Sequence, residues 1–102
     1  MRFLLTAEEF GASEALPIGL VQEVVPPGNH VERARAIAAT IAKQSPLGVQ
    51  TTLANARIGR RSGPQVAAEH IAAQLPTVLA SADAAEGLRS FVERREAKFE
   101  GR

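Results

Sequence analysis

Residues 45–76, SPLGVQTTLANARIGRRSGPQVAAEHIAAQLP, decide the fold class of this chain. Ser45-Pro46 marks a helix start, with serine at the cap and proline at the first helical position, and Pro64 opens a second helix after a break at 59–63. Apolar residues recur every three or four positions after each start: Pro46, Val49, Leu53 and Ala56, then Ala67, Ile71, Leu75 and Val78. Pro76 lies inside the second pattern and is expected to kink that helix or end it early.

Two more helices flank this pair. Asn29 is a good cap for a helix at about 30–44. The last helix is expected to begin near Asp83, with Glu86 three residues on as the aspartate version of a capping box. Its apolar stripe, which Arg95 interrupts, consists of Ala85, Leu88, Val92 and Phe99.

The N-terminal part predicts less helix. Ser13 can cap a short turn through about Leu16, which Gly19 can end in a left-handed conformation. Leu20–Val25 is rich in β-branched residues and predicts a short strand. A lone strand cannot satisfy its backbone groups, and no second convincing strand exists. The predicted fold class is mainly α, with four to five helices and one short N-terminal strand.

The composition predicts a thin hydrophobic core. A chain of 102 residues is one domain or part of one. Hydrophobic residues make up 45% of it, but alanine dominates them and aromatic residues are only 4%. Alanine buries little area, and apolar burial stabilises by only about 25 cal/mol per Å². The chain is therefore expected to be stabilised by contacts with a partner, another subunit or a further piece of chain.

Charge and cysteine content exclude several classes of protein. The net charge of +1 gives no overall attraction to nucleic acid or membrane, and the cluster at 57–61 (RIGRR) suits a helix C-terminus instead. There are no cysteines for disulfides or thiolate metal sites. Apolar runs fall far short of the ~20 residues that span a bilayer, and the start turns acidic too soon for a signal peptide. A cytoplasmic protein is expected, without a nucleic-acid or membrane partner.

No catalytic or metal-binding residue stands out. His30 and His70 lie on different predicted helices without a second ligand at metal spacing. General acid–base catalysis needs a carboxylate in an apolar pocket, and Glu23 and Glu69, which have apolar neighbours, are more typical of solvated edges.

Phe91 and Arg94 allow two interpretations. They are three apart on a predicted helix and so point to roughly the same side. A ring beside a guanidinium suits a flat heteroaromatic that carries phosphates. A core phenylalanine beside a solvated arginine is the alternative, and spacing alone favours it.

Three ordered stretches resemble the crotonase superfamily, the enoyl-CoA hydratase/isomerase proteins. LLTAEEFGASEALPIGLVQEVV (4–25) is similar to that family's "LLTG…A..A...GLV..VV", with Ala7 in place of the usual glycine and a less typical Pro17. IAKQSP (41–46) resembles "IA..SP". SADAAEGLRSFVERR (81–95) with FEGR (99–102) resembles the C-terminal "S.D..EG..AF.EKR.P.F.G". The match covers essentially the whole chain in order.

The resemblance implies one C-terminal helical domain, 1–102, in which 1–28 is a remnant of the edge of the spiral core and 29–102 is a helical oligomerisation region. The motifs for the oxyanion hole and the two catalytic glutamates of the family are not found in this sequence. The chain alone is therefore expected to be inactive. A truncated reading frame, an isolated domain and a degenerate paralogue all stay open.

The resemblance also implies what this region binds. It places Phe91 and Arg94 at the adenine end of a coenzyme A thioester, across an interface with a neighbouring subunit. The resemblance therefore favours a binding role for these two residues, whereas spacing alone favours a core phenylalanine beside a solvated arginine. A homo-oligomer, whether dimer, trimer or hexamer, is expected. A stand-alone helical oligomerisation module without catalytic activity is the alternative function, and the reaction of the parent enzyme stays open.

Overall fold

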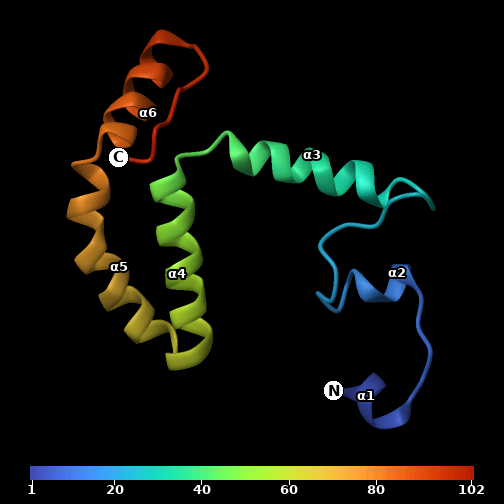
Figure 1. Cartoon of the computed structure of the whole chain (residues 1–102). Helices are drawn as coiled ribbons and strands as arrows, with labels where there is room; N and C mark the ends of the chain where they lie inside the picture. The colour runs from blue at the N-terminus through green and yellow to red at the C-terminus, as the bar shows by residue number, and fades with distance from the viewer. The chain divides into compact units, whose positions relative to one another are not determined.

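The computed structural model describes all residues, 1–102, and contains six helices and no strand (Figure 1). The chain divides into two units, Met1–Arg35 and Ala36–Arg102, with the boundary inside α3. The helices are α1 (Arg2–Thr6), α2 (Ala12–Ala15), α3 (His30–Ala42), α4 (Pro46–Ser62), α5 (Pro64–Leu79) and α6 (Ala82–Glu93). The mainly α fold class is confirmed, with six helices in place of four or five. None of them combines the length and apolar composition that crossing a bilayer requires.

The first unit begins with two short helices held by local contacts. Phe3 of α1 packs on Phe10 with ring centroids 4.1 Å apart. Gly11, and not the predicted Ser13, is the N-cap of α2. The Gly11 N–H donates to the Glu14 carboxylate at 3.3 Å, which satisfies one of the backbone groups at the start of that helix.

The predicted strand at Leu20–Val25 does not form. The segment has no ladder partner and belongs to the loop between α2 and α3. Its first two N–H groups, those of Leu20 and Val21, donate to the Ala15 carbonyl at 3.0 and 3.4 Å and so complete the end of α2. β-Branched residues favour extended backbone, but a strand needs a second strand to satisfy its hydrogen bonds, and this chain supplies none.

The second unit contains a helical hairpin of α4 and α5 (Figure 1). Both helix starts predicted from the sequence are confirmed. Ser45 caps α4 by accepting the Gly48 N–H at 3.2 Å, and Pro46 takes the first helical position, where a missing N–H costs nothing. Gly63 joins the helices with φ 91°, a conformation that glycine adopts readily, and Pro64 opens α5.

The break predicted at 59–63 is wrong in extent, and of the two outcomes predicted for Pro76 the early end is wrong, whereas the kink stays a prediction. The break at 59–63 is confined to Gly63, because α4 continues through Gly59 to Ser62. A Cβ atom at Gly59 would lie 3.4 Å from the Ala67 Cβ, so this glycine allows close packing of α4 against α5. Pro76 does not end α5 early, since the helix continues to Leu79 and the Pro76 carbonyl accepts the N–H of Ala80 at 3.0 Å.

The last helix differs from the prediction at both ends. Ser81, and not Asp83, is the N-cap of α6, and its hydroxyl accepts a first-turn N–H at 3.0 Å. The helix ends at Glu93, because Arg94 adopts a left-handed conformation. Phe99 therefore lies in a tail, residues 94–102, and not on the apolar stripe of α6. Figure 1 shows this tail reversing after α6 and returning along the helix.

The chain buries very little apolar surface of its own. Ala15 and Ala67 are its only buried apolar residues. Most large apolar side chains of α3, α5 and α6 are exposed to solvent, among them Ile71, Leu75, Leu88 and Val92 of the predicted faces. The others include Val31, Ile37, Ile41, Leu79 and Phe91. The expectation of a thin core is confirmed.

Candidate functional site

The structure places Phe91 and Arg94 together at the C-terminal end of α6. Phe91 is 82% exposed, so the interpretation as a core residue is wrong for this chain. Arg94 follows the last helical residue and has φ 53° and ψ 43°, and its N–H donates to the Phe91 carbonyl at 3.3 Å. Arg94 makes no salt bridge, so its guanidinium is available to another group. The contact of these two residues with coenzyme A stays a prediction.

The turn at Arg94 is held by the next residue. The Arg95 guanidinium donates to both oxygens of Glu86, at 2.5 and 2.9 Å, and Glu86 also accepts the Lys98 N–H at 2.9 Å. These hydrogen bonds, those from Arg95 first, lower the pKa of Glu86 from an ordinary 4.5 to about 2. A lowered pKa stabilises the folded state fully above pH 4.5, and the contribution is lost as the pH falls through about 2. Arg95, which interrupts the predicted apolar stripe, thus lies beyond the end of α6 and pairs with Glu86 inside the helix.

A second carboxylate fixes the end of the tail. Asp83, in the first turn of α6, is only 2% exposed. It accepts the Ser45 hydroxyl and the Glu100 N–H, both at 2.8 Å, and the Gly101 N–H at 3.1 Å. Burial raises the pKa of Asp83, but the hydrogen bonds from Glu100, Ser45 and Gly101 and the charge of Arg102 outweigh burial and leave the pKa below its ordinary value. One side chain therefore joins the tail to the starts of α4 and α6.

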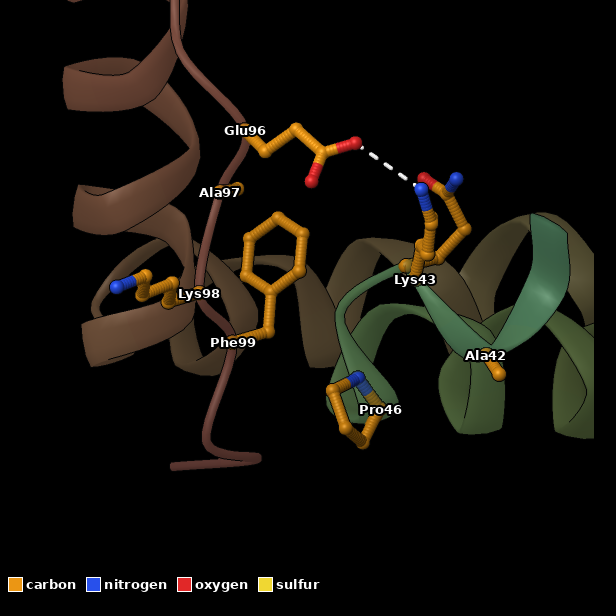
Figure 2. Close-up of a pocket in the computed structure, with 8 residues that line it drawn as sticks. Ala42, Lys43, Pro46, Glu96, Ala97, Lys98 and Phe99 are labelled. Carbon is orange, nitrogen blue, oxygen red and sulfur yellow. Dashed lines mark hydrogen bonds and ion pairs between the residues drawn. The ribbon is translucent and has the colours of Figure 1, made fainter. Parts of the chain in front are cut away.

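The tail also forms one wall of a surface hollow of about 490 Å³ (Figure 2). Lys43, at the end of α3, and Glu96, in the tail, form an ion pair of 3.0 Å across it. Figure 2 shows the Phe99 ring and the Lys98 side chain leaving the tail on opposite sides. The Phe99 ring also rests over Gly87, since a Cβ added at Gly87 would lie 3.7 Å from it. Phe99 thereby holds the tail against α6.

The other candidate groups are not gathered into a reactive centre. No group of three histidine, aspartate or glutamate side chains lies close enough to hold a metal ion. Glu23 is paired with Arg33 at 2.8 Å, and Glu69 accepts the Gln65 amide at 3.1 Å, so both carboxylates have ordinary partners on exposed surface. The end of α6 instead carries an exposed aromatic ring and an arginine without a salt bridge.

The basic residues at the end of α4 have a structural role. Arg60 and Arg61 lie in the last turn of that helix, where cations interact favourably with the partial negative charge of the free carbonyls.

The whole chain, residues 1–102, matches the family model described as enoyl-CoA hydratase/isomerase. The chain belongs to the enoyl-CoA hydratase/isomerase family. The resemblance inferred from the three motifs is thereby confirmed, and the mainly helical structure corresponds to the C-terminal helical region of the crotonase fold.

Individual members of the enoyl-CoA hydratase/isomerase family share the whole of this region. An (E)-benzylidenesuccinyl-CoA hydratase of Thauera aromatica is 36% identical over 99% of this chain. An enoyl-CoA hydratase of Mycobacterium tuberculosis is 37% identical over 97% of it. The solved structure of a probable enoyl-CoA hydratase/isomerase from Mycobacterium abscessus is 50% identical over 100% of the chain, with a TM-score of 0.92. This chain spans only 40%, 37% and 40% of the lengths of these three proteins, respectively.

The left-handed conformation of Arg94 predicts a stabilising substitution. Arg94→Gly is expected to raise the free energy of unfolding by about 0.5–1 kcal/mol. A residue with a Cβ is destabilised by roughly 1–2 kcal/mol in this conformation, and the larger conformational entropy that glycine has in the unfolded chain offsets only part of the relief. Urea unfolding followed by circular dichroism measures the change. Arg94→Ala removes the same side chain but keeps the strain, so it is the matched control. A glycine variant less stable than the alanine variant, by the entropy cost of glycine alone, would show that the turn stores no strain.

Proposed function

We propose that this chain works as the C-terminal segment of an enoyl-CoA hydratase/isomerase that acts on acyl-CoA thioesters, and that it is inactive alone. The observation that carries the proposal is the match of all 102 residues to the family over only about two fifths of the length of its relatives. A segment with two buried alanines as its apolar core is suited to pack against other protein. Its exposed faces on α3, α5 and α6 are the surfaces that further chain or neighbouring subunits would cover.

Within that assembly, Phe91 and Arg94 are proposed to contact the adenine end of coenzyme A from a neighbouring subunit. Phe91 offers an open ring face for stacking on a base, and Arg94 offers a guanidinium for a phosphate. The proposal is supported by their common position at the end of α6 and by the lack of any salt bridge to Arg94. The reaction of the assembled enzyme depends on residues outside this segment.

The proposal predicts that catalysis requires the rest of a family member. Purified chain is expected to give no hydration of a short trans-2-enoyl-CoA above the buffer rate, because no carboxylate here is placed to activate water. A chimera is the positive control: this chain replaces the matching region of the 50% identical Mycobacterium abscessus protein. Loss of the enoyl absorbance measures turnover. Turnover by the chain alone, or a folded chimera without turnover where its parent turns over, would contradict the proposal.

A stand-alone helical oligomerisation module is the second candidate function. The exposed apolar faces favour it, because surfaces of this kind rarely stay in water on a monomer. Light scattering over a range of concentrations separates the two candidates when combined with the chimera. Stable assemblies of the chain together with an inactive chimera favour the module, whereas a persistent monomer excludes it.

A further inference from the structure

We propose that residues 94–102 are a strap, closed by two separate carboxylate latches, that occupies the polar face of α6 and leaves the apolar face of that helix outward. The latches are Glu86, which holds residues 95–98, and Asp83, which holds residues 100–102. This inference concerns the chain itself and does not rest on the proposed function.

The polar face of α6 is the covered one. Asp83, Glu86, Gly87 and Ser90 recur at intervals of three and four residues and so share one side of the helix. Asp83 and Ser90 are buried, the Glu86 carboxylate receives Arg95 and the Lys98 N–H, and Gly87 lies beneath the Phe99 ring. Every one of these positions is small or engaged by a hydrogen bond, which lets the strap lie close against the helix.

The apolar residues lie on the other side of α6. Leu88, Phe91 and Val92 are 69%, 82% and 73% exposed. Burying such side chains normally stabilises a protein by about 1.5–3 kcal/mol each. Turning α6 about its axis would take Asp83 away from the Ser45 hydroxyl at the start of α4, whereas the strap would turn with the helix. A buried carboxylate that loses a partner costs free energy, so the contacts of Asp83 oppose that rotation.

The latches are independent because they bind different parts of the strap. The Arg95 and Lys98 groups bound to Glu86 lie before Phe99, whereas the Glu100 and Gly101 N–H groups bound to Asp83 follow it. Asp83 also donates its own N–H to the Arg102 carbonyl at 2.9 Å. Phe99, between the two latches, packs against Gly87 and so holds the middle of the strap on the helix when either latch opens. Opening one latch should therefore leave the other largely closed.

Amide hydrogen exchange on the full chain tests the strap. The N–H groups of Lys98, Glu100 and Gly101 have carboxylate acceptors in the closed strap, whereas those of Glu96, Ala97, Phe99 and Arg102 have none. Exchange rates are first divided by those of unstructured peptide. In the unmodified chain, the first three N–H groups are then expected to exchange at least about tenfold more slowly than the other four. Equal, unprotected exchange across all seven would overturn the proposal, and this measurement needs no substitution.

Substitutions separate the two latches. Asp83→Asn is expected to speed amide exchange at Glu100 and Gly101 by at least about tenfold and at Lys98 by much less. Glu86→Gln is expected to speed exchange mainly at Lys98. Glu93→Gln is the matched control, because Glu93 accepts the side-chain N–H of Arg95 but no backbone N–H of the strap. Circular dichroism identifies any variant that unfolds. If a variant unfolds, the exchange pattern of the unmodified chain decides whether the strap is closed. Loss of all three protections in each variant would overturn the independence of the latches.

Discussion

Replacing Gly59 by valine is expected to force α4 and α5 apart and to lower the free energy of unfolding by about 1–3 kcal/mol relative to Gly59→Ala. An alanine Cβ at this position would already touch the Ala67 Cβ at 3.4 Å. The two further methyl groups of valine branch from that same atom, so they have no room unless the hairpin opens. The α4–α5 interface is the most extensive helix packing in the chain, and no larger apolar core compensates for its loss.

Gly59→Ala is the reference variant because it adds the Cβ without branching. It should be neutral or stabilising by up to about 1 kcal/mol, since alanine is the better helix former. Arg60→Val places the same β-branched residue one position along, on exposed surface of α4, and should lower stability by no more than about 1 kcal/mol, through helix propensity and the lost charge at the helix end. Urea or thermal unfolding followed by circular dichroism ranks the three variants. Equal stability of the valine and alanine variants at Gly59 would show that the helices are not closely packed there.

Local sequence signals predicted the helix starts of the hairpin. Ser45-Pro46 and Pro64 act through their own backbone geometry and their immediate neighbours, so they are visible without a fold. Gly59 was predicted as a break for the same local reason, because glycine in isolation disfavours helix. The structure shows that its lack of a side chain serves the approach of Ala67, which follows in the sequence but belongs to another helix. Packing overrides propensity at this position.

The candidate site was less predictable, because its geometry depends on partners distant in the sequence. Asp83 was predicted to cap α6, since aspartate often does so, yet its carboxylate binds Ser45 and the tail. Ser81 was already present as the better cap, two residues earlier. Periodicity alone assigns Phe99 to the helix, and no glycine directly after Glu93 signals the left-handed turn that Arg94 makes. The pairing of Phe91 with Arg94 therefore rests on the shared end of α6 and not on a common helix face.

Substitution of the exposed Phe91 is expected to have a large effect on catalysis by the assembled enzyme. In the active chimera, Phe91→Ala is expected to lower kcat/KM for an enoyl-CoA by about 10–100-fold, because stacking a base on an aromatic ring is worth about 1–3 kcal/mol. Arg94→Ala is expected to act by a similar factor through the lost phosphate pair, worth about 1.5–3 kcal/mol. Arg94→Lys should recover part of that loss, since lysine keeps the charge but not the planar fork of donors. The steady-state rates of hydration measure all three.

The position of the contact on the substrate gives the decisive control. An enoyl-pantetheine carries the same reacting thioester but no nucleotide, so the Phe91 and Arg94 variants should hydrate it at the unmodified rate. Arg89→Ala removes an exposed arginine from the same helix, outside the proposed site, and should leave both substrates unaffected. If the losses were the same with the nucleotide-free substrate, the two residues would act on packing or on the reaction itself. If the variants lose kcat/KM with enoyl-CoA but not with enoyl-pantetheine, the end of α6 acts in recognition of the nucleotide.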